Sequence, residues 1–169
     1  RFRFRRFLSD ELDSVGQARD YIEECLRKPG DQFNKALQDL VNHTASLLGF
    51  EVEYGRYRGI RNDIGFDGLW KWGDRFIVVE VKTTDTYSIS TSVLLGYINR
   101  LISEGRIRND RQVLGLYVFG RSDSQLKEVA NSIIAEGRTT QLRIATSDDL
   151  LTLAELVQES LITTEEAVT

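Results

Sequence analysis

The sequence is short of several residue types on which common kinds of site depend. Its 169 residues include one cysteine, one histidine and no methionine. The single cysteine, Cys25, excludes an internal disulfide, which is typical of a cytoplasmic protein. Without a second histidine or further cysteines, neither a zinc site nor Ser-His-Asp catalysis is expected. His43 is expected on the polar surface of a helix.

Long hydrophobic runs are also missing. No apolar run approaches the roughly 18 residues that a membrane span needs, and no secretory signal pattern is present, so no membrane partner is expected. Because position 1 is Arg1 rather than methionine, we expect a piece of a longer parent protein with further domains, or a processed start.

Positive charge is in deficit, since the net charge is −4. This argues against a general, charge-driven nucleic-acid binder. It does not exclude a nuclease, because metal ions can supply positive charge where the phosphate lies. The first seven residues are only Arg and Phe. They predict an incoming strand or linker, or alternatively a nucleic-acid contact by Arg and aromatic stacking.

Apolar and turn-forming residues are spaced as in alternating helices and strands. Helices are expected over residues 9–27, 31–48, 90–104, 124–136 and 147–157, with Ser9 and Ser147-Asp148-Asp149 as caps. Strands are expected over residues 50–57, 64–72, 75–83, 113–119 and 141–146. This order predicts an α/β fold, with a mixed β-sheet core flanked by helices on both faces. We expect a helical lead-in over 1–30, one domain over 31–157 and a loose tail over 158–169.

The dipeptide Gly73-Asp74 is a two-residue hairpin signal between two strands. A turn at these residues places Asp67 directly opposite Glu80, with Cβ atoms roughly 5 Å apart. Lys82 lies two residues beyond Glu80 and therefore on the same face. Two carboxylates and one ammonium group are thus expected to converge on one patch of the sheet.

Two carboxylates so close together repel each other unless a cation lies between them. Magnesium prefers oxygen ligands and usually takes only one or two carboxylates from the protein. Glu80 and Lys82 also lie in an apolar β-branched run, where charges are costly unless paired or bound to metal. The alternative is that Glu-Val-Lys marks the solvated face of a hairpin with a cross-strand ion pair.

Two segments of this hairpin carry a family resemblance. Residues 62–69, Asn-Asp-Ile-Gly-Phe-Asp-Gly-Leu, and residues 78–84, Val-Val-Glu-Val-Lys-Thr-Thr, resemble the PD-(D/E)xK nuclease superfamily, although Phe66 stands where the name of the family has proline. Residues 31–157 resemble its restriction-endonuclease-like core, and residues 80–121 resemble domains of restriction or phage-defence proteins.

The resemblance implies a Mg²⁺-dependent deoxyribonuclease in which Mn²⁺ can substitute. Asp67, Glu80 and the Val81 carbonyl would hold the metal, and Lys82 would orient the attacking water. Many members carry a polar residue near the metal on the preceding helix. Here the candidates are Asn34 and Gln38, which could equally be solvated. Phosphate contacts could come from Thr83, Thr84 and Tyr87, which could equally form a polar loop.

We therefore expect a DNA endonuclease domain of restriction or phage-defence type, with DNA as partner. A homodimer is also expected, because cutting both strands usually requires two active sites. The rival is a catalytically silent DNA-binding or interaction module on the same fold. A third possibility, compatible with the first, is a regulated effector within a larger protein.

Overall fold

The chain folds around one mixed β-sheet with helices on both faces. The structure, a computed structural model, describes residues 2–55, 64–83 and 89–168. Its helices are α1 (Phe2–Glu11), α2 (Val15–Arg27), α3 (Asp31–Leu47), α4 (Ser92–Ser103), α5 (Ser124–Ala135), α6 (Ser147–Gln158) and α7 (Thr164–Val168). Its strands are β1 (Glu51–Tyr54), β2 (Gly68–Trp72), β3 (Arg75–Lys82), β4 (Val113–Phe119) and β5 (Leu142–Thr146).

The five strands lie in the order β1-β2-β3-β4-β5. Strands β1, β2 and β3 are antiparallel neighbours, whereas β3, β4 and β5 run parallel. Trp72 pairs with Arg75 and Gly68 with Val79, which is the register that a two-residue turn at Gly73-Asp74 predicts. The expected mixed α/β class is therefore confirmed.

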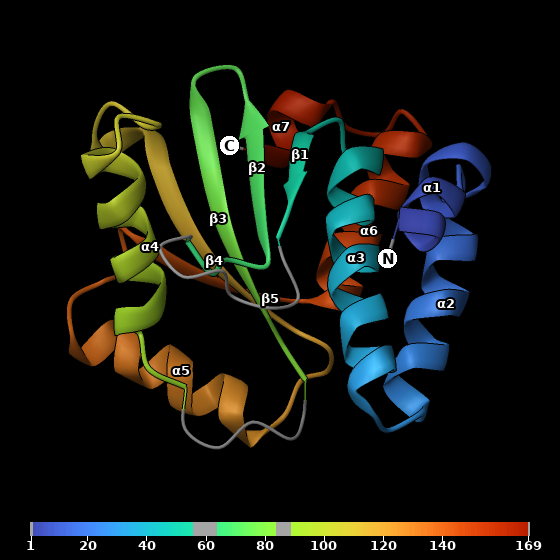
Figure 1. The fold of residues 1–169 in the computed structure, drawn as a ribbon, viewed down its shortest axis with the longest axis horizontal. Coiled ribbons are helices and arrows are strands. Elements are labelled where there is room, and N and C mark those ends of the chain that lie inside the picture. The colour runs from blue at the N-terminus through green and yellow to red at the C-terminus, as the bar shows by residue number, and fades with distance from the viewer. Residues whose placement is uncertain (1, 56–63, 84–88, 169) are drawn as a thin grey trace.

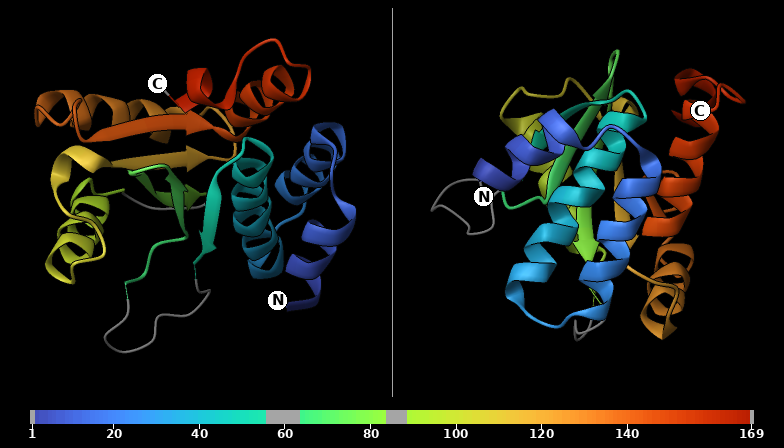
Figure 2. Two further views of the ribbon diagram at one scale, coloured as in Figure 1. Left: turned by 90° about the horizontal axis from the view of Figure 1, so that it is seen from above. Right: turned by 90° about the vertical axis from the view of Figure 1, so that its right-hand side faces the viewer.

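Two hydrophobic clusters form, one on each face of the sheet. The first joins α1, α2, α3 and α6 to one face, and the second joins α4 and α5 to the other. Figure 1 shows the strands between α4 on one side and α1, α2 and α3 on the other, and Figure 2 gives the same arrangement from two further directions. Within the described residues, no helix is long and apolar enough to cross a membrane.

The N-terminal segment differs from the expectation. The single helix over 9–27 is in fact two helices, and Ser14 rather than Ser9 is the cap, because its side chain accepts from the Gln17 N–H over 3.1 Å. The described part of the Arg/Phe opening belongs to helix α1, so a strand or linker is wrong for it. Leu8 and Leu12 are buried in the cluster around α3, so these helices are part of the main core.

Packing of this segment also explains why His43 is buried, although the sequence predicted it on the surface. His43 is only 6% exposed, and its Nε2 lies 2.6 Å from the Leu12 carbonyl, in the turn between α1 and α2. Burial lowers the pKa of His43, although the contact with Leu12 acts in the opposite direction. The neutral imidazole is therefore a core residue that joins α3 to the N-terminal helices.

The C-terminal third needs two smaller corrections. Thr146, rather than the following residues, caps α6 through a reciprocal capping box with Asp149. The polar tail, expected to be loose, contains the short helix α7, and its Ala167 and Val168 pack against the larger core. Among the described residues, the remaining helices and strands agree with the expectation to within a few residues at their ends. The end of the strand expected over 50–57 lies outside the described residues.

Candidate active site

Strand β3 brings Glu80 and Lys82 onto the face of the sheet that α4 covers. Val79 and Val81 pack into the cluster around α3, whereas Val78 packs into the cluster around α4. Because successive side chains of a strand alternate between faces, Glu80 and Lys82 lie on the face of Val78. Lys82 Nζ donates to Glu80 Oε1 over 2.8 Å, and the two side chains are only 16% and 13% exposed. The ion pair is therefore largely shielded from water.

Asp67 lies directly before β2, and its peptide groups are held on both sides. Its N–H donates to the Val79 carbonyl over 3.0 Å. Its own carbonyl accepts from the Gly55 N–H over 2.8 Å and from Asn42 Nδ2 over 2.9 Å. Three elements of the fold, β1, β3 and α3, thus fix the position of this residue.

The Asp67 carboxylate continues the β-ladder beyond the end of β2. The last paired residue of β2 is Gly68, opposite Val79, so the Val81 N–H points past the end of that strand. Asp67 Oδ2 accepts this N–H over 2.8 Å. The N–H and C=O of one residue in an antiparallel strand point to the same neighbour, so the Val81 carbonyl also points toward Asp67.

The two carboxylates interact electrostatically at a site that is largely shielded from water. Burial, and then the negative charge of Glu80, raise the pKa of Asp67 to about 7, while the Val81 N–H and Lys82 act in the opposite direction. Glu80 Oε2 is buried and has no hydrogen-bond partner among the described residues. A buried carboxylate oxygen in this condition is costly, so this pair of side chains fits a bound cation.

Two tyrosines interact electrostatically with the carboxylates. Tyr117 is the β4 partner of Glu80, and its hydroxyl donates to the Ser90 carbonyl over 2.8 Å. Tyr97, on α4, is half-buried. For both phenols, burial and the charge of Glu80 help to raise the pKa to about 12. Both therefore stay protonated at neutral pH and can take part as hydrogen-bond donors but not as bases.

The two residues of α3 that were expected near the metal, Asn34 and Gln38, form no side-chain hydrogen bond with Asp67 or Glu80 among the described residues. Both lie half-buried on the helix. Asn42, one turn further along, is the helix residue that reaches Asp67, and the sequence interpretation missed it. The available signal was the series of amide side chains at positions 34, 38 and 42, which follow one another at intervals of four residues along one side of the helix.

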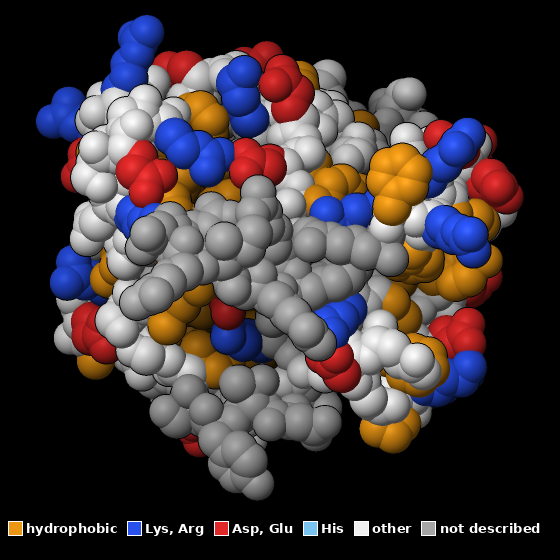
Figure 3. All heavy atoms as spheres, viewed as in Figure 1, with side chains coloured by type: hydrophobic (Ala, Val, Ile, Leu, Met, Phe, Trp, Pro, Cys, Tyr) orange, Lys and Arg blue, Asp and Glu red, His pale blue; other side chains and the backbone are white. Residues whose placement is uncertain are grey.

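The proposed phosphate contacts follow β3 directly. Thr83 is half-buried and comes immediately after Lys82. Thr84 and Tyr87 lie outside the described residues. Figure 3, which has the viewpoint of Figure 1, shows a hollow near the middle of the visible face of the molecule, where acidic and basic side chains lie among apolar ones. Within the described ranges, no group of three or more His, Cys, Asp or Glu side chains is arranged so that it could hold a metal ion.

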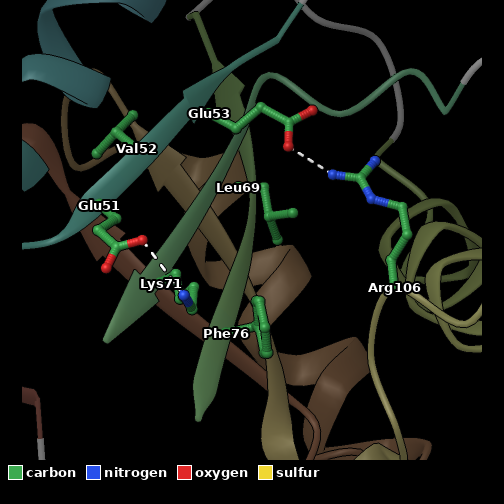
Figure 4. A pocket seen from close by; sticks show the side chains of 7 residues that line it. All are labelled: Glu51, Val52, Glu53, Leu69, Lys71, Phe76 and Arg106. Atoms are coloured by element: carbon green, nitrogen blue, oxygen red, sulfur yellow. Dashed lines mark hydrogen bonds and ion pairs between the residues drawn. The ribbon is translucent and has the colours of Figure 1, made fainter. Parts of the chain in front are cut away.

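An open groove lies over β1 and β2, further along the same face. It encloses about 270 Å³, and the described residues that line it are Glu51, Val52, Glu53, Leu69, Lys71, Phe76 and Arg106. Figure 4 shows the Glu51–Lys71 and Glu53–Arg106 ion pairs across it. Its cations are already paired with acids on β1, so the groove offers little attraction to a phosphate backbone. The chemistry-bearing residues are those at Asp67 and Glu80.

Comparison of the sequence with protein-family models and with curated proteins gives no match.

Proposed function

We propose that this chain is a metal-dependent nuclease domain that hydrolyses phosphodiester bonds in DNA. The observation that carries the proposal is the buried Glu80 Oε2, which has no partner among the described residues although its carboxylate interacts with that of the half-buried Asp67. Burying two interacting carboxylates costs free energy unless a cation or a proton compensates. A divalent metal ion compensates both charges at once.

The residues that would hold the metal are Asp67, Glu80 and the carbonyl of Val81. All three ligands are oxygens, and two carboxylates suffice for Mg²⁺, which keeps several waters and binds substrate phosphate. Mn²⁺ also accepts carboxylate and carbonyl oxygens. Once bound, such an ion supplies a Lewis acid that polarises the scissile phosphate and acidifies a water.

Lys82 would contribute a positive charge at the same place. Its ammonium group now donates to Glu80 Oε1 and is largely buried, so its charge is little screened by solvent. A compact ammonium with three donors can hold an attacking water and stabilise the negative charge that develops on the phosphate. The half-buried Asn34 and Gln38 and the following Thr83 are second-rank candidates for water or phosphate contacts.

The mixed sheet, with α3 on one face and α4 on the other, is compatible with a restriction-endonuclease-like fold. We extend the proposal to a restriction or phage-defence role, with DNA as the substrate. A homodimer would be the form that cuts both strands. Further domains of a parent protein would regulate the activity. Support for this part comes from the resemblance of residues 62–69 and 78–84 to PD-(D/E)xK nucleases.

A catalytically silent binding module is the second candidate. The Lys82–Glu80 ion pair favours it, because a closed pair already compensates one of the two carboxylates. Such a module would bind DNA or a protein partner without metal-dependent cleavage. The unpartnered Glu80 Oε2 and the raised pKa of Asp67 favour the enzyme, because a purely structural pair has no need for either.

Cleavage of supercoiled plasmid by the domain, with Mg²⁺ or Mn²⁺, tests the enzyme directly. We expect metal-dependent nicking that EDTA abolishes, and a loss of at least about 100-fold in Lys82→Ala, since one electrostatic group in an active site is worth that much. Lys71→Ala is the matched control: it also removes a lysine from this face, but one paired to Glu51 in the groove. Wild-type cutting by Lys82→Ala would exclude the assigned site.

A further inference from the structure

Asn42 is a fully buried polar residue whose side-chain amide forms hydrogen bonds both as a donor and as an acceptor. It is 0% exposed on α3. Its Nδ2 donates to the Gln38 carbonyl and to the Asp67 carbonyl, each over 2.9 Å, and its Oδ1 accepts from Trp70 Nε1 over 2.8 Å. One amide thus ties α3 to the beginning of β2 at two points, three residues apart.

The close approach of Asn42 depends on a glycine between those two points. A Cβ at Gly68 would lie 1.9 Å from Asn42 Oδ1, which is far inside contact distance. Gly68 shows no positive φ, so its backbone does not require glycine. The missing side chain therefore makes room for the Asn42 amide.

These contacts bear on the carboxylate of Asp67. The Asp67 carbonyl has two donors, the Gly55 N–H and Asn42 Nδ2, whereas the carboxylate reaches the Val81 N–H beyond the end of β2. The Asp67 backbone lies past the last ladder pair of β2, and Asn42 adds a side-chain donor to the two backbone hydrogen bonds that hold it, those with Val79 and Gly55. The direction of the carboxylate then depends on how firmly the Asp67 peptide is held.

We propose that Asn42 is a positioning residue that holds the Asp67 peptide so that its carboxylate lies beside Glu80 and the Val81 backbone. Its relevance to catalysis rests on the proposed nuclease function; the positioning itself does not. Asn42 touches no reacting group and acts only through Asp67. The Val81 N–H reports this directly, because Asp67 Oδ2 is the acceptor of that hydrogen.

The test uses ¹⁵N NMR on the metal-free domain, comparing wild type, Asn42→Leu and Trp70→Phe. Both variants remove the Trp70–Asn42 hydrogen bond and disturb the same buried region. Only Asn42→Leu removes the donor to Asp67. We expect exchange of the Val81 amide in Asn42→Leu to accelerate about tenfold relative to amides of residues 116–118, the equivalent of one hydrogen bond. In Trp70→Phe the Val81 amide should keep its wild-type ratio to the same amides.

Gly68→Ala is the second variant, for the case that Asn42→Leu does not fold. It displaces the Asn42 amide without removing it, and the same selective acceleration at Val81 is expected. An unchanged Val81 ratio in the folded variants, or an equal change in Trp70→Phe, would overturn the positioning role.

Plasmid cleavage is the separate, second readout. If the wild type cuts DNA, Asn42→Leu should lower kcat about tenfold with little change in KM, since only the position of a metal ligand is altered. A selective Val81 effect with no wild-type cleavage would keep the positioning role and reject the nuclease. Wild-type cleavage with an unchanged Val81 ratio would reject the positioning role and keep the nuclease.

Discussion

Asp67 is the residue whose environment departs furthest from that of an ordinary aspartate. An exposed aspartate titrates near pH 3.8, whereas burial and the nearby Glu80 carboxylate raise the pKa of Asp67 to about 7. The fold therefore favours the protonated form of this side chain. At neutral pH a proton and a metal ion compete for the same carboxylate, which makes pH a direct probe of the site.

The stability of the metal-free domain should fall between pH 5 and pH 8 because of Asp67. A raised folded pKa stabilises the fold below the unfolded pKa, and this contribution is lost as pH rises through the folded pKa. Compared with Asp67→Asn, the free energy of unfolding of the wild type should decrease by on the order of 2 kcal/mol over this range. Urea unfolding of both proteins in EDTA measures the difference.

Groups that do not interact with Asp67, such as His43, titrate alike in both proteins and cancel in this comparison. Adding Mg²⁺ at pH 8 should restore stability to the wild type but not to Asp67→Asn, because only the former keeps the anionic ligand. Parallel pH profiles for the two proteins would show that the fold does not favour protonated Asp67.

At the residue scale, the sequence predicted side chains that a local rule controls. Strand alternation and the two-residue turn put Glu80 and Lys82 on one face with Asp67 at the end of the opposing strand. Asn42 and His43 were not predicted, because their roles depend on which distant segments pack against α3. Leu12, the partner of His43, is 31 residues away in sequence, and no periodicity gives that distance.

At the element scale, one arginine adds polar contacts between α1 and the body of the domain to the apolar packing of that helix. Arg5 donates to Asp39 through Nε over 2.9 Å and through Nη2 over 2.7 Å, and Nη2 also donates to the Gly55 carbonyl over 2.8 Å. Its guanidinium lies 4.5 Å from the centre of the Tyr54 ring. Since the Gly55 N–H donates to the Asp67 carbonyl, α1 is two hydrogen bonds away from the candidate site.

Arg5→Met should lower the free energy of unfolding by about 3 kcal/mol, because it removes the guanidinium that lies 2.7 Å from the fully buried Asp39 carboxylate. Arg6→Met is the control on the same helix: its pair with Asp10 is 72% and 55% exposed, so a change below about 0.5 kcal/mol is expected. Chemical denaturation gives both values. Similar losses in the two variants would mean that the Arg5–Asp39 pair contributes no more than a surface pair.

Elements were predicted well where local signals are strong. Gly73-Asp74 predicted the hairpin, and the nearly continuous apolar run over 113–119 predicted the interior strand β4. The first helical segment was wrong because the break at Ser14 interrupts a polar-apolar pattern that reads equally well as one helix. What separates α1 from α2 is their packing on α3, where Val15 and Ala18 are buried beside Leu8.

At the scale of the whole molecule, the two faces of the sheet differ in what they carry: one supports the larger hydrophobic core and the other carries the candidate site. One face packs α1, α2, α3 and α6 into the larger cluster, whereas the other carries α4, α5 and the charged residues of β3. Charged side chains of a site keep their geometry better when the strand that carries them is packed into a rigid core. The N-terminal helices thus belong to the support of the candidate site.

A chain that starts at residue 31, the boundary that the sequence suggested, should therefore fail to fold on its own. Removal of α1 and α2 uncovers the side of α3 against which Leu8, Leu12, Val15, Ala18 and Ile22 pack, and each is at most 2% exposed. At about 1.5 kcal/mol or more for each large apolar side chain, the loss approaches the whole stability of a typical domain.

A chain that ends at residue 158 is the matched control, because the only helix it loses is α7, which has no fully buried residue among those described. Circular dichroism and the dispersion of the amide proton spectrum should show an unfolded chain in the first case and a folded one in the second. Cooperative unfolding of the chain that starts at residue 31 would make residues 1–30 a separable lead-in after all.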